Sequence, residues 1–503
     1  MIEAKTSLIR ELVEVNDAST TPIYEQIYED IRKSIIEGKL APGTRLPSTR
    51  SLTDVLGVSR TTVTNAFDRL KSEGYLRSHV GSGTFVSKNL PPQHTQLRRP
   101  TSPSGPSASA SFSQDPSPFL SDQGAFVMKG LPPMVEHPTK QMAFNPGVPA
   151  YDAFPIDTWS SLASQRWRFL QRDELVYGNP AGYKPLREAV ANYLRERRGV
   201  RCDAEQIIIT AGAQHAFTLV ARVLIDEDDD VFVEDPGYPL MRAAFGVAGA
   251  QLHPVPVDDE GIQVSTVRDR VRPNLVAVTP SHQYPLGTTM SLSRRLQLLD
   301  WSAETDAWIL EDDYDSGYRY SGRPIAALQG LDRRGSVLYA GTFSKVLFPA
   351  LRLGYLAVPK NLVDPFVRMR DLMDRSPPRV AQMILLDFME EGHLREHLQK
   401  MRTLYLSRKN MLTSALREEL GTFMEVHDNE AGLHLVGRLP KEIDDQALSR
   451  HLRTHDLLTL PLSTHSESEL ERGGLLLGFG CVPEEEIGPE VQRIATALES
   501  FRA

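Results

Sequence analysis

The sequence lacks the features that tie a protein to a membrane or to an oxidising compartment. It has only two cysteines, Cys202 and Cys481, too few for a disulfide framework or a cysteine-based zinc site. No apolar run approaches the roughly 20 residues of a membrane-spanning helix, and residues 1–5 lack the apolar segment of a signal peptide. We therefore expect a cytoplasmic protein with no metal site and no membrane contact.

An overall excess of positive charge is also absent. The net charge of −9 argues against nucleic-acid binding by the whole surface, although it leaves room for a small basic region. Hydrophobic residues make up 41% of the chain, as in ordinary globular proteins. With 503 residues the chain is too long for one hydrophobic core, so we expect two or three domains.

Near the start of the chain, the residue pattern predicts three helices and a hairpin. One face of the first helix carries isoleucines four residues apart, namely Ile23, Ile27, Ile31 and Ile35. Two further helices, 48–56 and 59–73, each begin at a serine suited to an N-cap and are each followed by a glycine. Segments 75–77 and 84–86 would pair around a glycine-rich turn. Together these elements predict a winged helix-turn-helix.

The basic residues gather in this same segment. Between residues 45 and 88 seven basic side chains stand against three acidic ones, a local charge of +4. In a winged helix-turn-helix, the helix at 59–73 would enter the DNA major groove, where Arg60 can form a bidentate pair with guanine. A winged helix that only contacts protein is the alternative, and the charge segregation argues against it. The predicted DNA-binding residues are Arg50, Ser59, Arg60, Thr61 and Thr62, with His79 and Gly81 at the tip of the wing.

This segment resembles the GntR family of winged-helix regulators. The matching motifs are Leu46-Pro47-Ser48-Thr49-Arg50, then segments 56–63, 73–76 and 81–86, in the family's order and spacing. The resemblance implies binding to a double-stranded DNA operator.

Residues 89–138 differ in composition from both flanking regions. They are rich in proline and serine and cannot bury a core, which indicates a flexible linker. An ordered arm anchored by Phe112, Phe119 and Phe126 is the alternative. We therefore divide the chain into a DNA-binding domain at 17–88, a linker at 89–138 and a third region at 139–503. A flexible stretch of about 45 residues would span roughly 35–40 Å, comparable with one DNA turn of about 34 Å.

In the third region, short apolar strands alternate with helical patterns. Continuous apolar runs separated by helices imply an α/β domain with a mainly parallel sheet that is buried on both faces. The predicted strands are 207–209, 231–233, 275–278, 308–310 and 337–339.

A single lysine follows the last of these strands, in Gly341-Thr342-Phe343-Ser344-Lys345. A lysine in a tight turn after a buried strand can lose its proton and form a Schiff base with an aldehyde. Thr342, Ser344 and Arg352 could hold a phosphate. The pattern predicts Lys345 as the attachment point of pyridoxal 5'-phosphate (PLP).

Other strands end in residues that a PLP site needs. Asp312 could keep the pyridine nitrogen protonated, and Tyr314 could hydrogen-bond the ring hydroxyl. Tyr238 could stack on the ring, while Ala213 and Gln214 open a helix whose backbone amides can hold the phosphate. Because open α/β sheets bind ligands at the carboxyl ends of their strands, these residues predict one site.

From about Ala143 onward the chain resembles a fold-type I aminotransferase. Further matching motifs are Asn145-Pro146-Gly147 and segments 177–187 and 279–287. In that family the tyrosine that matches Tyr177 reaches the cofactor phosphate of the partner subunit, so the resemblance implies a homodimer with shared sites. Where the family usually carries an asparagine to the ring hydroxyl, this chain has Tyr284, next to His282 and Gln283.

With this order of parts, the chain is identified as a member of the MocR subfamily of bacterial regulators. The resemblance implies a PLP-dependent transcriptional regulator that senses PLP, an amine or an amino acid and controls genes of vitamin B6 or amino-acid metabolism. A genuine aminotransferase with an accessory DNA-binding domain is the alternative. A regulator with a decayed, cofactor-free pocket is a third, and the intact set around Lys345 argues against it.

One position departs from the aminotransferase pattern. The family's late arginine, which binds the substrate α-carboxylate, is expected to correspond to Leu476. Arg472 is close to it in sequence but outside the expected strand, and Arg242 could substitute for it. Losing a bidentate arginine weakens the binding of an ordinary amino acid. We therefore expect weak or absent turnover, and an effector that is an amine, a differently held amino acid or PLP itself, as in the subfamily's pyridoxine-synthesis regulators.

Overall fold

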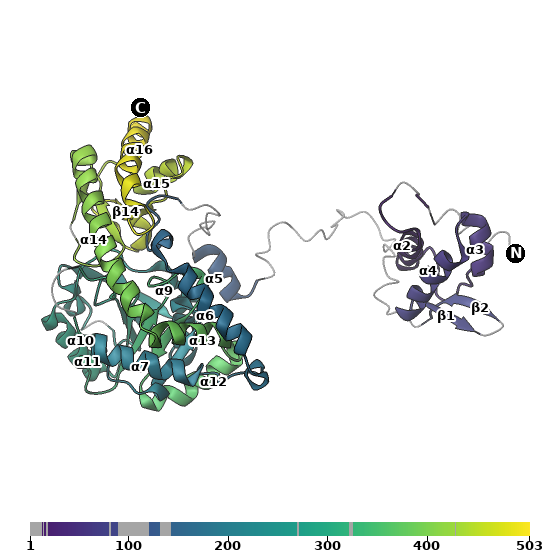
Figure 1. Cartoon of the computed structure of the whole chain (residues 1–503), viewed down its shortest axis with the longest axis horizontal. Coiled ribbons are helices and arrows are strands. Elements are labelled where there is room, and N and C mark those ends of the chain that lie inside the picture. Colours follow the sequence, from purple (N-terminus) through teal and green to yellow (C-terminus); the bar gives the residue numbers. More distant parts are fainter. Residues whose placement is uncertain are drawn as a thin grey trace, which may run out of the picture. The chain divides into compact units, whose positions relative to one another are not determined.

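The computed structural model describes residues 13, 15–16, 19–79, 82–88, 120–130, 142–268, 271–320, 325–427 and 429–502. The chain divides into two compact units, Met1–Ser113 and Gln114–Ala503 (Figure 1). No helix in the described ranges is both long enough and apolar enough to span a membrane.

The N-terminal unit has the predicted three helices and hairpin. The isoleucine face of the first helix is buried in one core with side chains of the other two helices, such as Leu52 and Phe67. The winged helix-turn-helix is therefore confirmed. Its elements are α2 (Ile23–Ile36), α3 (Thr49–Leu56), α4 (Arg60–Ser72), β1 (Leu76–His79) and β2 (Gly83–Val86).

Local capping explains where α3 and α4 begin. The hydroxyl of Ser48 accepts a hydrogen bond from the backbone N–H of Ser51, and Ser59 accepts one from Thr62, both at 3.1 Å. Each serine satisfies an amide that the first helical turn leaves without a partner. Gly57 ends α3 in the left-handed conformation, with φ of +68°. These local signals fix the start of the helix predicted to read DNA.

The second unit is built on an eight-stranded sheet in the order β3-β10-β9-β8-β7-β4-β5-β6. Neighbouring strands from β9 to β5 pair in parallel, whereas β10 runs antiparallel to both β3 and β9, and β6 runs antiparallel to β5. The predicted, mainly parallel sheet is confirmed. The strands are β3 (Ile207–Thr210), β4 (Asp230–Asp235), β5 (Gln251–Asp258), β6 (Gly261–Ile262), β7 (Leu275–Val278), β8 (Trp308–Asp313), β9 (Val337–Thr342) and β10 (Gly354–Ala357).

Helices cover both faces of this sheet because its strands are apolar on both sides. Alternate residues of one strand enter different cores: Ile208 packs with α8 and α9, whereas Ile207 and Ile209 pack with α7 and α13. The helices are α6 (Ile156–Phe169), α7 (Lys184–Arg198), α8 (Ala213–Leu224), α9 (Pro239–Val247), α10 (Leu292–Thr305), α11 (Leu328–Leu331), α12 (Val363–Asp374) and α13 (Arg379–Glu390).

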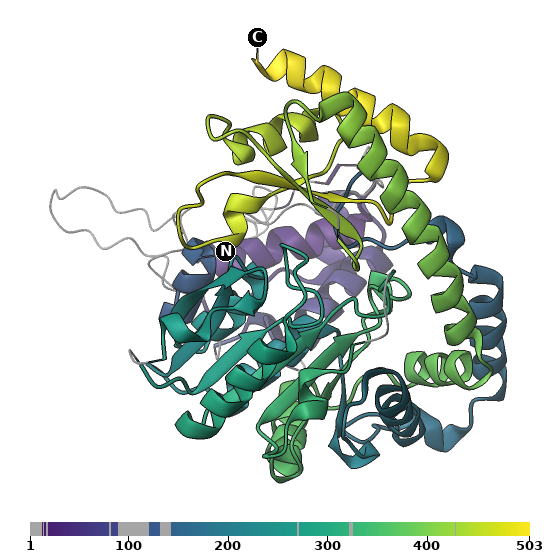
Figure 2. The ribbon, with the colours of Figure 1, turned by 90° about the vertical axis from the view of Figure 1, so that its left-hand side faces the viewer.

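A smaller antiparallel sheet, in the order β11-β12-β14-β13, follows the long helix α14. In its register Leu476 of β14 lies between Val436 of β12 and Leu460 of β13. Figures 1 and 2 show α14 and α16 side by side over this part of the unit. The elements are α14 (His393–Leu420), β11 (Glu425–Val426), β12 (His434–Arg438), α15 (Asp445–Thr454), β13 (Leu460–Pro461), β14 (Gly474–Gly478) and α16 (Glu484–Arg502).

The region predicted as a flexible linker differs from that expectation over residues 122–130, which form helix α5 (Asp122–Gly130). This helix packs on α9, and the ring of Phe126 lies against Gly246. An apolar contact with α9 is thus the reason for the local order. The other two proposed anchors, Phe112 and Phe119, lie outside the described residues, and the three domain boundaries stay predictions.

Candidate cofactor site and DNA-binding surface

The strand directions bring the predicted cofactor residues to one edge of the large sheet. Because β10 is antiparallel to both β3 and β9, those two strands run in the same direction. Thr210 at the end of β3 and Thr342 at the end of β9 both pair with Gly354, one on each side. A Cβ at Gly354 would lie 2.8 Å from the carbonyl oxygen of Gly341. The absent side chain therefore allows the two loops to approach.

Lys345 lies in the turn that follows β9. Its Nζ donates a 2.8 Å hydrogen bond to the backbone oxygen of Gly147. Burial lowers the pKa of Lys345, while the carboxylates of Asp315 and Asp312 partly oppose this effect. A lowered pKa increases the fraction of free amine, which is the form that attacks an aldehyde. A Cβ at position 147 would lie 2.5 Å from Nζ, so the glycine makes room for the lysine.

Asp312, one residue before the end of β8, has an unsatisfied carboxyl group. It is 4% exposed, and its Oδ1 has no hydrogen-bond partner among the described residues. Burial raises its pKa well above the usual range, Asp313 and Asp315 add to the rise, and Lys345 opposes it. A buried carboxyl oxygen without a partner is costly. A protonated pyridine nitrogen would satisfy it, so the residue fits the role predicted for PLP.

Tyr314 belongs to a buried hydrogen-bonded group. Its hydroxyl lies 2.8 Å from Nδ1 of His282, and the same nitrogen lies 2.9 Å from Oδ2 of Asp315. A proton on Nδ1 donated to the Asp315 carboxylate leaves the tyrosine proton available to another acceptor. The sequence placed His282 in the motif at 279–287 without giving it this role. The two hydrogen bonds join His282 to residues 32 and 33 positions further along the chain, so only the fold reveals them.

The rings of Tyr238, Tyr284 and Tyr314 line another side of the site. The Tyr238 and Tyr284 rings have centroids 5.4 Å apart, and the Tyr284 and Tyr314 rings 5.7 Å apart, both edge to face. Burial raises the pKa of Tyr238 to about 12, so it is a neutral phenol. The hydroxyl of Tyr284 lies 3.2 Å from Nε2 of His465, whose pKa burial lowers to about 4. A neutral imidazole can accept this proton, so Tyr284 has a partner within the protein.

The start of α8 forms a cradle suited to a phosphate. Gly212 caps the helix with φ of +86°, and the amides of Ala213 and Gln214 begin its first turn. Arg352 donates a 2.7 Å hydrogen bond to the oxygen of Ala211, which holds its guanidinium beside the cap. Helix amides and a guanidinium favour an anion at this point. The side chain of Gln214 is engaged elsewhere, since its Nε2 donates to the oxygen of Leu240 at 2.9 Å.

Apolar side chains surround Leu476, the residue predicted to replace the family's carboxylate-binding arginine. Leu476 is fully buried in a cluster with Val436 and Leu462, and Tyr284 packs against this cluster. An arginine introduced there would be a buried charge without a partner.

The proposed substitute, Arg242, and the nearby Arg472 both make other contacts. Arg472 pairs with Glu425 at 2.8 Å and donates to the oxygen of Leu439. Arg242 donates to the oxygen of His465 at 2.8 Å and pairs with Glu467 at 3.4 Å. Neither guanidinium is therefore free to bind a ligand carboxylate without losing these partners.

Tyr177 lies at the surface. It is 86% exposed and belongs to a stretch of exposed apolar residues that otherwise comprises Trp167, Phe169, Leu175 and Val176. Several large exposed apolar side chains close together in the sequence are what a protein interface would cover.

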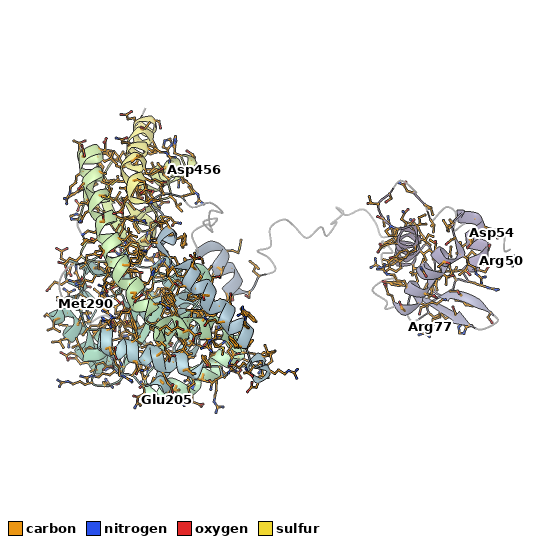
Figure 3. The ribbon with its side chains drawn as sticks, in the orientation of Figure 1. Arg50, Asp54, Arg77, Glu205, Met290 and Asp456 are labelled. Carbon is orange, nitrogen blue, oxygen red and sulfur yellow. The ribbon has the colours of Figure 1, made fainter. Side chains whose placement is uncertain are left out.

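In the N-terminal unit, the predicted DNA-binding residues form an exposed face. Arg50, Arg60 and Thr61 are exposed, while the hydroxyls of Ser59 and Thr62 lie 2.8 Å apart at the helix start. Figure 3 shows Arg50 and Arg77 on this unit. His79 is exposed at the end of β1, and Gly81 lies outside the described residues.

The ion pairs divide the basic residues of this unit into two groups. Arg69 pairs with Glu25 and Glu73, and Lys71 pairs with Asp68. For Arg45, Arg50, Arg60 and Arg77 the described residues supply no carboxylate within ion-pair distance. Arg45, which the sequence did not nominate, lies beside the wing with its Nε 3.0 Å from the position of a Cβ at Gly83. The unpaired arginines are thus at the first turn of α3, at the start of α4 and at the wing.

Comparison with known proteins agrees with both units. Residues 23–86 match the bacterial regulatory proteins of the gntR family, and residues 139–472 match aminotransferase class I and II. The chain is 38% identical over 477 residues to the probable rhizopine catabolism regulatory protein MocR of Rhizobium meliloti, covering 95% of this chain and 94% of that protein. It is 31% identical to the HTH-type pyridoxine biosynthesis transcriptional regulator PdxR of Corynebacterium glutamicum, over 97% and 98% of the two chains.

Among solved structures, the second unit is similar to the kynurenine aminotransferase of Pyrococcus horikoshii in complex with PMP. The TM-score is 0.70 at 26% identity, over 78% of this chain and 99% of that one. The matched domains and the full-length relatives define a class of DNA-binding transcriptional regulators with an aminotransferase-like domain. The chain belongs to the MocR subfamily of the gntR family. The regulator interpretation is thus confirmed over the accessory-domain aminotransferase.

Proposed function

We propose that this regulator binds PLP as a Schiff base with Lys345 and that bound PLP changes its affinity for an operator. Two observations carry the proposal together: a partly buried lysine of lowered pKa, and a buried carboxyl oxygen of Asp312 that lacks a partner. PLP also requires a site for its phosphate, and Arg352 beside the start of α8 provides an anion site there. PLP, when bound, supplies an aldehyde for the lysine and a ring cation for the aspartate.

Within this proposal each predicted residue has one task. Tyr238 covers the ring, and Tyr314 donates its proton to the ring oxygen, because the Nδ1 proton of His282 is donated to Asp315. The phosphate is held by Arg352 and Thr342 together with the amides of Ala213 and Gln214. Tyr284, which is hydrogen-bonded to His465, lines the site. The PMP bound by the Pyrococcus relative supports the cofactor class.

We further propose that the active form is a homodimer in the cytoplasm, with Tyr177 of one subunit reaching the cofactor of the other. The exposed apolar stretch around Tyr177 supports this arrangement, because water would otherwise cover several large side chains.

The central experiment is a footprint of the protein on DNA upstream of its own gene, with and without PLP. We expect protection of two half-sites separated by about 34 Å or a multiple, as a dimer requires, and a shift in the midpoint concentration when PLP is added. Identical footprints with and without PLP would contradict PLP as effector. Protection of a single half-site would contradict the dimer.

We also propose that the second unit turns over amino acids weakly or not at all. The carboxylate position holds Leu476, and Arg242 and Arg472 are engaged in ion pairs. An α-carboxylate would lose its hydration here without gaining a bidentate partner.

A matched pair of amines tests this proposal by absorbance. L-phenylalanine and phenethylamine differ only in the carboxylate, so we expect both to change the spectrum of the PLP-loaded protein at similar rates, with no accumulation of the cofactor's amine form. Conversion at least about tenfold faster with the amino acid, equivalent to about 1.4 kcal/mol, would show a functional carboxylate site and refute the proposal.

A further inference from the structure

The helix α5 is held to the second unit by a small contact. A Cβ at Gly246 of α9 would lie 2.3 Å from Cζ and 2.9 Å from Cε1 of Phe126, so the phenylalanine ring lies directly on the glycine. The other apolar side chains of the segment remain open to solvent, with Val127 38% and Met128 66% exposed. A helix of nine residues is too short to persist alone in water. The structure of α5 therefore depends on its contact with α9.

The opposite end of α9 belongs to the candidate cofactor site. Tyr238 is the N-cap of α9, and its ring contacts Tyr284. The oxygen of Leu240, in the first turn of α9, accepts the hydrogen bond from Gln214 in the first turn of α8. One helix of nine residues, Pro239–Val247, thus connects the ring-stacking tyrosine and the phosphate cradle at one end with the seat of Phe126 near the other.

We propose that α5 is a latch on α9 whose docking is strengthened when the cofactor site is filled. This inference rests on the proposed function and names its means of regulation. A ligand that contacts Tyr238 and the start of α8 restricts the positions available to α9, and so favours the one arrangement in which Gly246 lies under Phe126. Along the sequence, residues 89–119 separate α5 from the winged helix.

Thermodynamic linkage makes the proposal measurable without DNA. If bound PLP strengthens α5 docking by some factor, docked α5 must strengthen PLP binding by the same factor. Coupling of this kind is commonly about fivefold or more. Removing the latch should therefore weaken PLP binding by that factor, although no residue that touches the cofactor is changed.

The variants are Gly246→Ala, which expels the phenylalanine ring, and Phe126→Ala, which removes it. The control is Gly488→Ala in α16, where an added Cβ has nothing within 4 Å. The first measurement is hydrogen–deuterium exchange of peptides covering 122–130 in the full chain. We expect PLP to slow exchange about fivefold or more in the unchanged protein and in Gly488→Ala, and exchange to be fast with and without PLP in both latch variants.

The second measurement is the dissociation constant of PLP, followed by absorbance. We expect both latch variants to bind PLP more weakly by the factor seen in exchange, and the control to match the unchanged protein. Exchange of α5 that ignores PLP, or latch variants that lose protection yet bind PLP with full affinity, would overturn the latch. A wild-type footprint that ignores PLP would instead overturn the proposed function and leave these two measurements to judge the latch separately.

Discussion

Replacing Lys345 by alanine is expected to abolish the visible absorbance of the PLP-loaded protein and its DNA response to PLP. The partly buried amine that hydrogen-bonds to Gly147 is the candidate nucleophile, and its lowered pKa supplies the free base. Without it no Schiff base can form, while the cradle around Arg352 can still hold the phosphate weakly. An absorbance titration with PLP, followed by a footprint at saturating PLP, measures both effects.

Lys360→Ala is a matched control for this substitution. Lys360 is an exposed lysine of the same unit that pairs with Asp203 at 2.8 Å, so its loss should leave the spectrum unchanged. A visible band that persists in Lys345→Ala, or one that disappears in Lys360→Ala, would mean that the attachment point has been assigned to the wrong lysine. Circular dichroism on both variants separates loss of attachment from loss of folding.

Replacing Arg60 by alanine is expected to weaken operator binding by about 5- to 150-fold, the equivalent of the roughly 1–3 kcal/mol that a bidentate arginine–guanine pair contributes. Arg60 is the first residue of α4, exposed beside its serine cap, and the described residues offer it no ion-pair partner. Its guanidinium group is therefore available to form two hydrogen bonds with the edge of a base. A mobility-shift titration on the footprinted operator at fixed salt measures the change.

Two companion variants distinguish base recognition from general charge. Arg60→Lys keeps the charge but loses the fork, so it should lose discrimination between operator and unrelated DNA while keeping most non-specific binding. Lys71→Ala removes a basic residue at the far end of α4 that is already paired with Asp68, and should change affinity little. If Lys71→Ala and Arg60→Ala weakened binding equally, the start of α4 would not be the reading surface.

The winged helix could be predicted closely because its signals are local. A serine cap, a closing glycine and a row of isoleucines are read from residues within one or two helical turns, and the structure repeats them at Ser48, Ser59 and Gly57. The carboxyl ends of the parallel strands were also predictable, since each apolar run gives way to polar residues such as Glu311 and Asp312. Strand β10 was not predicted, because its four residues carry no alternation that marks an antiparallel strand.

Contacts between distant residues could not be predicted in this way. The bond from Tyr314 to His282 depends on β7 and β8 being neighbours in the sheet. The engagement of Arg242 by the oxygen of His465 joins residues 223 positions apart. Composition alone also predicted a linker where α5 forms, because the deciding partner, Gly246, lies 120 residues beyond Phe126 in the sequence.

The sequence by itself determined what chemistry this regulator has available: a helix that can read DNA, and a lysine, an aspartate and an arginine suited to PLP. These follow from residue type and from spacing within single elements. Only the tertiary structure decided which of the relevant side chains already have partners and which elements contact the site. In the folded protein Leu476 is buried among apolar neighbours, and Arg242 and Arg472 form ion pairs with Glu467 and Glu425. The fold also places α5 on α9, the helix whose N-cap is Tyr238. The physical reason is that a side chain's partner is chosen by the fold, whereas its capacity to bond is fixed by its own atoms.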